Sequence, residues 1–326
     1  MAGCGLTRDG RADSFSLAAM SGPALGAMVP PVPTHGTARP PLQRDTPRGL
    51  GLALIGGISL SFDIPLIRLA GSDPWMVMLL RGGGMAIVLW LYWRFISQRR
   101  FMPVHLLSDR DFITVGALSG LNNICFTLAV FNTSTANVVF ILAFSSMAAA
   151  LMSWALVGER PSAATWWAIA ATIVGVALIV AGSLDGGNWV GDLLALVCAI
   201  LIALSITLAR RSGKDLSMAP GFGGVVSALF ALPTVFVFSA MPAAPQWILI
   251  DAFILVPLAG ITLWLAPRFI PAPHVALFYL LETVLAPIWV WLVFAETPSR
   301  NVFIGGAIVL GAIFLHTLFE LRRRQA

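Results

Sequence analysis

The sequence contains few charged residues and few cysteines for its length. Only 11% of its 326 residues are Asp, Glu, Lys or Arg, whereas soluble domains carry about 25%. Hydrophobic residues make up 58% of the chain, and its mean hydropathy is +0.88. A soluble fold of this size cannot hide so much apolar surface, because surface-to-volume scaling limits its interior. Lipid must therefore be the solvent for most of the chain.

The cysteine and histidine patterns exclude several kinds of site. Cys4, Cys125 and Cys198 lie far apart, so they form neither a disulfide framework nor a zinc or CxxC motif. The four histidines are scattered as well. We therefore expect no metal and no cofactor, and we expect the protein not to be an enzyme. The net charge of +5 is attributed to basic loops of a membrane protein rather than to nucleic-acid binding.

Residues 1–48 differ from the rest of the chain. They are rich in Pro and Arg and poor in large apolar residues, and such a segment cannot offset its ordering entropy by burial. We expect a disordered cytoplasmic tail here. No apolar stretch of adequate length follows the first arginines, so a signal peptide is not expected. An alternative is that translation starts at Met20 or Met28.

Ten apolar runs follow, each about the length that a helix needs to cross the hydrocarbon core. Short connections rich in Pro, Gly, Asp, Asn or Arg separate them. Helices satisfy every backbone amide within lipid, and the period-2 alternation of a β-barrel is not seen. The predicted spans are 50–69, 75–96, 112–131, 135–157, 164–183, 190–209, 221–241, 246–266, 274–294 and 301–319.

The basic residues predict an orientation. If the N-terminus is cytoplasmic, seventeen Lys and Arg residues fall on cytoplasmic segments and only Arg68, Arg81 and Arg300 fall outside. This bias places both termini in the cytoplasm, and the even number of spans agrees with it.

A repeated motif indicates an internal duplication. Glu159 and Glu296, 137 residues apart, each begin a Glu-x-Pro-Ser motif after an apolar run. The prediction is two five-helix repeats, 49–183 and 190–320, followed by a basic cytoplasmic tail at 321–326. Because five is odd, the second repeat must be inverted relative to the first, and in such carriers the substrate site lies near the midplane between the repeats. Both glutamates are expected to be turn or capping residues.

The chain resembles the drug/metabolite transporter superfamily, EamA-like branch, over about 50–320. The resemblance rests on "DPWMVMLLR" with Pro74 and Arg81, and on Gly-Glu-Arg-Pro at 158–161. The ninth run adds a further set: Pro287, Trp291, Glu296 and Pro298. The resemblance implies ten helices, a cytoplasmic N-terminus and small-molecule transport. Many relatives carry Pro where this chain has Ala150, so the fourth span is expected to be straighter.

Polar groups within the spans are the candidate site residues, because a charge at mid-bilayer costs about 2.5–3.5 kcal/mol on insertion scales. Glu282 lies near the centre of the ninth span, next to Thr283, and the repeat places Ser145 and Ser146 opposite them. Glu282 is interpreted as a substrate contact or a proton carrier. The alternative is a neutral glutamate that hydrogen-bonds between helices.

Several other polar or aromatic residues have two interpretations each. Asp63 either pairs with Arg68 or Arg81 or belongs to a periplasmic gate, and Arg81 either snorkels to the interface or clamps a carboxylate. Asn122 and Asn123 either find partners in the bundle or line a wet cavity. The remaining assignments are path-lining or packing for Trp154 and Trp291, an interfacial position for His274 and His316, and a headgroup boundary for Asp251.

These observations favour an inner-membrane secondary carrier that works by alternating access. We expect it to export a small amphipathic or amino-acid-like metabolite. Protons, acting through Glu282, are a candidate coupling ion, and membrane lipids surround the protein. A passive channel or a lipid flippase on the same scaffold is the alternative. A membrane-embedded enzyme would need a convergent set of catalytic side chains, for which the scattered histidines and acids give no support.

Overall fold

A computed structural model describes the part of the chain that carries all the predicted spans, and these residues belong to one compact unit, Gln43–Ala326. Residues 1–45 of the predicted tail at 1–48 lie outside the described residues, as do Glu159 and Glu296. Residues 46–48 begin the first helix instead. The described residues are 46–96, 108–158, 160–184, 188–214, 216, 218–239, 241–266, 269–270, 272–295 and 298–325.

Within this part of the chain the regular structure is entirely helical. Each predicted span becomes one helix or a run of two or three consecutive helical segments. The first half of the unit consists of α1 (Thr46–Ser61), α2 (Asp63–Leu69), α3 (Pro74–Ile96), α4 (Arg110–Asn132), α5 (Thr135–Ala143), α6 (Ser145–Val157) and α7 (Ala163–Leu184). The second half consists of α8 (Trp189–Ser212), α9 (Ala219–Phe238), α10 (Pro245–Ile250), the π-helical segment η3 (Asp251–Leu255), α11 (Val256–Leu265), α12 (Ala272–Phe294) and α13 (Arg300–Gln325).

The all-α polytopic membrane fold is confirmed. Nine helices of the described residues are long and apolar enough to cross a membrane, and α12 adds a shorter apolar stretch at Phe278–Phe294. The predicted boundaries hold within a few residues. The largest departure is α13, which continues as a helix to Gln325, through most of the segment that was expected to be a tail.

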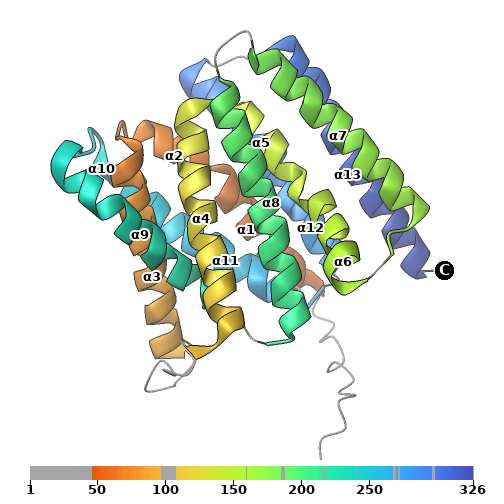
Figure 1. The fold of residues 1–326 in the computed structure, drawn as a ribbon, viewed down its shortest axis with the longest axis horizontal. Helices are drawn as coiled ribbons and strands as arrows, with labels where there is room; N and C mark the ends of the chain where they lie inside the picture. Colours follow the sequence, from red (N-terminus) through yellow and green to blue (C-terminus); the bar gives the residue numbers. More distant parts are fainter. Residues whose placement is uncertain are drawn as a thin grey trace, which may run out of the picture. The chain divides into compact units, whose positions relative to one another are not determined.

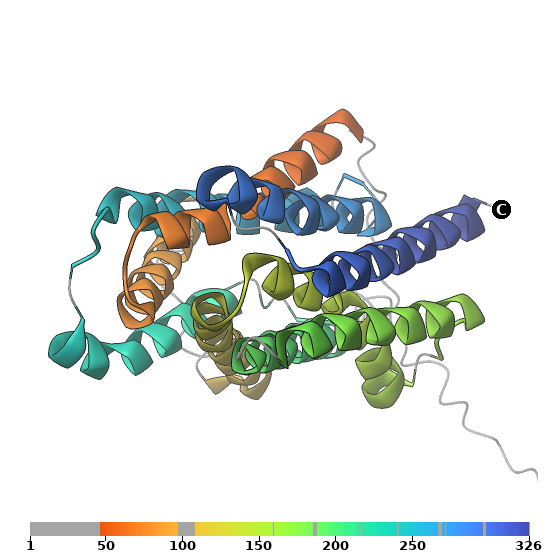
Figure 2. The same cartoon turned by 90° about the horizontal axis from the view of Figure 1, so that it is seen from above.

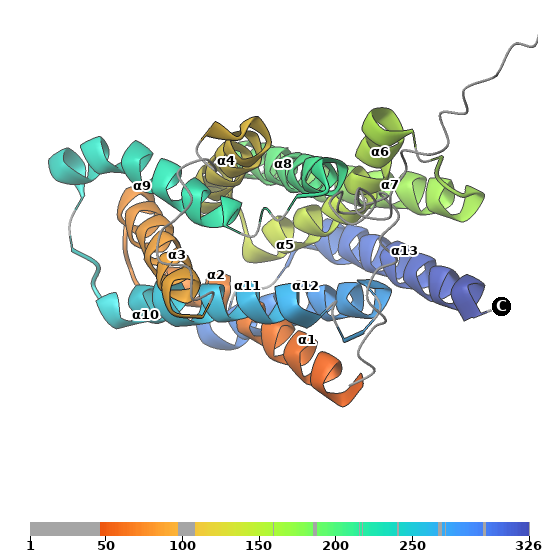
Figure 3. The same cartoon turned by 90° about the horizontal axis from the view of Figure 1, so that it is seen from below.

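The two halves are interleaved rather than placed side by side. Helix α4 packs against α8 and α9, while α1 packs against α11 and α12 (Figure 3). Helices α7 and α13 lie along each other at one side of the unit, as Figures 1 and 2 show. The main contacts of each half are therefore made with the other half.

The packing keeps its pattern when the halves are exchanged. The contact of α4 with α8 has a counterpart in that of α11 with α1, and the contact of α5 with α8 has one in that of α12 with α1. Three contacts join corresponding helices directly, namely α3 with α9, α5 with α12 and α7 with α13. An inverted duplication requires this exchange, so the pattern supports the duplication, which stays a prediction.

The first span is interrupted at Phe62, between α1 and α2. The Ser61 hydroxyl donates to the carbonyl oxygen of Ile58 at 2.7 Å, which competes with the regular helical ladder. Trp289 of α12 braces the break: its indole stacks on Phe62 at 4.9 Å between ring centroids, and its Nε1–H donates to the Ser61 hydroxyl at 3.0 Å. The break therefore fixes the direction of Asp63, the first residue of α2.

The expectation of a straighter fourth span is wrong. The span is divided at Phe144 into α5 and α6 although it contains no proline, whereas α12 is a single helix through Pro287. At the division the backbone tightens, since the Phe144 N–H bonds the Ile141 carbonyl and the Met147 N–H bonds the Phe144 carbonyl. The Ser146 hydroxyl donates to the carbonyl of Ala143 at 3.0 Å, and such back-bonding bends helices.

The eighth span contains the π-helical turn η3. The Val256 N–H donates to the carbonyl of Asp251 across five residues, one more than in an α-helix. Pro257 follows immediately; a proline lacks the N–H and its ring clashes with the carbonyl four residues earlier. Widening the preceding turn relieves that clash. The extra residue rotates Asp251 relative to an ideal α-helix.

Glycines let α7 and α13 approach closely. A Cβ at Gly305 of α13 would lie 2.5 Å from the carbonyl oxygen of Gly175 on α7, and one at Gly175 would lie 2.7 Å from the carbonyl oxygen of Gly305. Gly311 lies on the same helix with nothing within 4 Å of its Cβ position. The two helices therefore meet backbone to backbone at one point, as small residues allow in membranes.

Replacing Gly305 by Ala should push α7 away from α13 and destabilise the protein by about 1–3 kcal/mol, the usual cost of overpacking. Gly311→Ala on the same helix should be neutral or stabilising, because Ala favours helix by about 1 kcal/mol. Thermal unfolding of both variants in one detergent measures the difference. Equal stability of the two variants would contradict the close contact.

Candidate functional site

A cavity of about 630 Å³ lies between the two halves. Its walls come from α1, α2, α3, α4 and α8 and from both parts of the fourth span, together with α12 and α13. Eight of the ten predicted site residues line it: Asp63, Arg81, Asn122, Asn123, Ser145, Ser146, Glu282 and Thr283. The structure thus brings together residues that are up to 220 positions apart in the sequence.

Arg81 is held by Asp63 inside the unit. Its Nη2 lies 2.6 Å from the Asp63 Oδ2, and its guanidinium lies 4.7 Å from the centroid of the Phe126 ring. Both side chains are buried. Of the two interpretations of Arg81, clamping a carboxylate is therefore confirmed, and snorkelling is wrong. The Arg68 Nη2 donates to the Thr133 carbonyl at 3.0 Å.

The expectation that Asp251 lies at a headgroup boundary is wrong. Asp251 is 0% exposed, and its Oδ2 lies 3.6 Å from the Nε of Arg81. The sequence prediction failed because distance from the end of a span gives depth only, while the π-helical turn and the packing of η3 on α3 set the direction of the side chain. Arg81 therefore faces one carboxylate from each half.

Asn122 and Asn123 combine both of their predicted roles. The Asn123 Nδ2 donates to the Ser227 hydroxyl of α9 at 2.8 Å, and the Asn122 Oδ1 accepts from the Cys198 thiol of α8 at 2.7 Å. Both asparagines also line the cavity. Their amides thus tie α4 to two helices of the second half.

Trp154 and Trp291 do not line the cavity, so that interpretation is wrong. Trp154 is 45% exposed and packs edge-on against Trp166, and Trp291 is 53% exposed. Their position along the span is as expected, but both side chains face away from the bundle. Periodicity could not find the inward side, because these helices are apolar around their whole circumference.

The cavity wall also contains residues that were not predicted as site residues. Tyr279, His316 and Cys198 line it, and the ring Nε2 of His316 lies 3.0 Å from the Thr165 hydroxyl of α7. His316 was expected at the interface because it comes late in its span. The side chain of His274 lies outside the described residues.

A second cavity of about 590 Å³ continues the first toward one end of the unit. The two cavities share five lining residues, Arg81, Asn122, Asn123, Ile202 and Ile206. From Arg81 the second cavity extends to Arg210 and Lys214, beyond the C-terminal part of α8. Since the Lys214 side chain is 48% exposed, the cavity reaches the surface there. We refer to this side as the Lys214 end.

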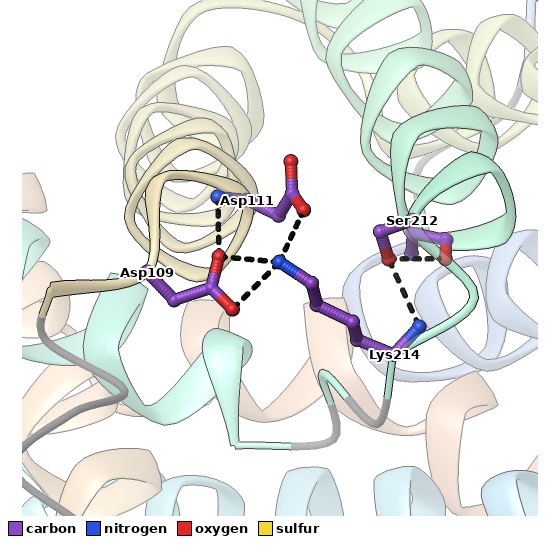
Figure 4. A network of polar contacts seen from close by, with 5 residues as sticks. Asp109, Asp111, Ser212 and Lys214 are labelled. Atoms are coloured by element: carbon purple, nitrogen blue, oxygen red, sulfur yellow. Dashed lines mark hydrogen bonds and ion pairs between the residues drawn. The ribbon is translucent and has the colours of Figure 1, made fainter. Parts of the chain in front are cut away.

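Lys214 joins the segment after α8 to the start of α4 (Figure 4). Its Nζ lies 2.8 Å from the Asp109 Oδ2 and 2.7 Å from the Asp111 Oδ2. Asp109 also caps α4, accepting from the N–H of Asp111 at 2.9 Å, as N-cap residues do. The ion pairs bridge the two sides of the cavity mouth.

These ion pairs persist over a wide pH range. The hydrogen bond from Lys214 lowers the pKa of Asp109 below its ordinary value of 3.8, and hydrogen bonds to Asp109 and Asp111 raise the pKa of Lys214 above 10.5. The contribution of Asp109 to stability is thus present above pH 3.8 and lost as pH falls through the lowered pKa. The contribution of Lys214 is present below pH 10.5 and lost as pH rises through the raised pKa. The ion pair between Lys214 and Asp109 is therefore not a pH switch for the cavity mouth near neutral pH.

The opposite end of the unit, which we call the Asp192 end, is closed by a buried polar network. The Asp192 Oδ1 accepts from the Thr133 hydroxyl at 2.6 Å and from the Asn137 Nδ2 at 2.9 Å. These bonds tie the first turn of α8 to the junction of α4 and α5. Nearby, the N–H of Ala244 donates to the carbonyl of Ala70 at 3.1 Å. The cavity is therefore separated from this end by hydrogen-bonded protein.

The comparisons with known proteins agree with this architecture. Residues 47–181 match the model of the EamA-like transporter family. This part of the chain is similar to the EamA-like transporters. The match is consistent with the drug/metabolite transporter superfamily, and the long apolar helices support a multi-pass membrane protein.

The fold has a counterpart among solved structures. A crystal structure described only as that of a protein aligns with 85% of this chain and 99% of its own, with a TM-score of 0.55 and 19% sequence identity. At that identity the likeness concerns the fold alone. None of the curated protein sequences matches this chain. Among the described residues no three His, Cys, Asp or Glu side chains are grouped as metal ligands would be.

Removal of the Arg81 charge should leave Asp63 and Asp251 buried without a cation. Breaking a buried ion pair from one side typically costs about 3–5 kcal/mol, so Arg81→Met should lower thermal stability strongly. Adding Asp63→Asn to Arg81→Met should restore part of the loss. Arg94→Met, at the exposed end of the same helix α3, is the matched control and should change little. An Arg81→Met protein as stable as this control would show that the cluster is not held by its charge.

Proposed function

We propose that this protein is an inner-membrane secondary carrier that exports a small organic, amphipathic or amino-acid-like metabolite by alternating access, with both termini in the cytoplasm. The observation that carries the proposal is the cavity between the two interleaved halves, which holds the charged groups Asp63, Arg81 and Glu282. Carriers built from inverted repeats bind their substrates near the midplane between the repeats. The family match supports transport as the activity.

The walls of the cavity suit a small amphipathic molecule. Its volume of about 630 Å³ lies within the usual range of about 300–1,000 Å³ for small-molecule sites. Apolar side chains, among them Leu60, Val139 and Ile202, form much of the lining, and Glu282 with Thr283 supplies a polar patch on α12. In such a site apolar contacts supply affinity, while a few polar groups fix orientation. We assign Glu282 to the charged or amine group of the substrate, and its protonation is the candidate coupling step.

The difference between the two ends supports alternating access over a channel. The cavity reaches the surface at Lys214, while Thr133, Asn137 and Asp192 form hydrogen bonds across the opposite end. A passive channel needs a path that is open at both ends at once. We assign the Lys214 end to the cytoplasm, because the basic residues of the sequence gather on that side. The described conformation is then the inward-open one.

Counterflow in proteoliposomes tests the carrier function. Vesicles loaded with one unlabelled amino acid are assayed for uptake of the same labelled amino acid, and the panel covers all proteinogenic amino acids and simple aliphatic amines. Uptake above the equilibrium level is expected for at least one compound. Glu282→Gln should reduce its rate about 10-fold or more, because a hydrogen bond to a charged group contributes about 1.5–3 kcal/mol.

The matched control is Trp291→Phe on the same helix, whose side chain faces outward, and it should transport normally. Uptake that never exceeds equilibrium would favour a channel. A Glu282→Gln protein with unchanged rate and unchanged response to a pH gradient would remove Glu282 from the mechanism.

The orientation is tested by the side from which Lys214 can be reached. In a Cys4→Ser background, Lys214→Cys should react with an impermeant maleimide in inverted vesicles and not on intact cells. Cys125 and Cys198 are buried, so they supply a low background. Arg300→Cys, at the start of α13, is the control and should react on intact cells only. The reverse pattern would invert the assignment and make the described state outward-open.

A further inference from the structure

The cluster around Arg81 contains more carboxyl groups than cations. Arg81 Nη2 bonds Asp63 at 2.6 Å, whereas its Nε is 3.6 Å from Asp251, too far for a hydrogen bond. Asp251 is 0% exposed, and neither of its oxygens has a hydrogen-bond donor. Asp63 Oδ1 and the Arg81 Nε and Nη1 lack partners as well. Two buried carboxyl groups thus face one guanidinium.

This arrangement is unstable if both carboxyl groups are ionised. One negative charge would then be buried without a partner, and such a group takes up a proton rather than bear the cost of desolvation. The carboxyl groups of Asp63 and Asp251 both lie against this guanidinium, where α2 packs on η3. Two carboxyl groups in contact commonly share one proton, since like charges so close cannot both ionise. A proton on one of them would donate to an oxygen that now lacks a donor.

We propose that Asp63 and Asp251 hold one proton between them, beside Arg81, and that this proton links the two halves of the transporter. Asp63 comes from α2 in the first half and Asp251 from η3 in the second, so the shared proton bonds one half to the other. Both aspartates begin a segment after an irregularity, at the Phe62 break and at the π-helical turn. Irregular backbone at this depth is typical of binding sites in membrane proteins.

The other ionisable groups nearby do not replace this proton. Glu282 of α12 interacts electrostatically with Asp63 and Arg81 and adds a further acidic group. Tyr279 on the same helix and Cys198 of α8 line the same cavity as Glu282 and Arg81. Helices α10 and α11, which pack on η3, carry no ionisable side chain. A metal ion in place of the proton would be repelled by the guanidinium.

The two cavities give the proton a route to solvent toward the Lys214 end. Asp63 and Arg81 line the cavity, while Asp251 lines neither cavity. Exchange must therefore pass through Asp63 to the Lys214 end. Loss of the proton would set two carboxylates against each other across the contact of α2 with η3, which favours separation of the halves there. The link to transport rests on the proposed carrier function; the proton itself does not.

Infrared difference spectroscopy of the purified protein in lipid bilayers tests the shared proton. The protein is grown with aspartate labelled with ¹³C at the side-chain carboxyl, so that the carbonyl stretch of a protonated aspartic acid shifts with the label. At pH 7 we expect one such band in the wild type. Asp63→Asn and Asp251→Asn should each remove the same band, whereas Glu282→Gln should leave it in place.

Asp192→Asn is the matched control, because Asp192 is equally buried but accepts hydrogen bonds from Thr133 and Asn137. Asp192 lies outside the Arg81 cluster, so this variant should keep the band. Absence of any labelled band in the wild type overturns the proposal without recourse to a variant. A band that survives either Asp63→Asn or Asp251→Asn overturns it as well.

The same vesicles separate this proposal from the carrier function. If the band behaves as expected and counterflow is absent for the whole panel, the proton site stands and the transport assignment fails. If counterflow occurs and the band is missing, the carrier function stands and the shared-proton proposal fails. Where both are present, Asp251→Asn should abolish the response of transport to a pH gradient.

Discussion

A buried guanidinium is the group on which the interior of this protein depends. Removing a charge from water costs several kcal/mol even after relaxation, and Arg81 is nearly as buried as the apolar residues around it. The cost is offset by carboxyl groups that no single helix could supply. Asp63 comes from the first half and Asp251 from the second, while the ring of Phe126 covers the guanidinium. Only the assembled halves bring both carboxyl groups to this guanidinium.

The need to pair polar groups inside the protein also explains where the helices are irregular. In lipid, every backbone group needs a partner within the protein, so irregular segments persist only where protein or a wet cavity surrounds them. The break at Phe62 is covered by Trp289, and the tightened turn at Phe144 precedes two serines of the cavity wall. The π-helical turn at Asp251 packs on α3. Each irregularity therefore lies beside the polar interior and turns a side chain into it.

The sequence predicted the spans well because the length of an apolar run, which decides whether a helix can cross lipid, is visible directly in the sequence. It also predicted eight of the cavity residues, since a polar side chain within a long apolar run must find a polar environment. It failed where direction around the helix mattered. Trp154 and Trp291 have the expected depth but face outward, and Asp251 has an apparently peripheral depth but faces inward. The direction of Asp251 depends on one extra residue in a turn and on contacts with α3, which no local pattern contains.

The unequal ends bear on how such a protein can change conformation. At the Asp192 end a buried carboxylate accepts bonds from Thr133 and Asn137, whereas the ion pairs of Lys214 are exposed to solvent. Breaking the buried hydrogen bonds at the Asp192 end therefore costs more free energy than the exposed ion pairs supply when the Lys214 end closes. The two conformations of a transporter must lie within a few kcal/mol of each other in free energy. Interactions in the interior must therefore offset the difference that the two ends leave. A molecule held between Asn123 of α4 and Glu282 of α12 touches one helix of each half, and its binding energy then acts on the junction that has to move.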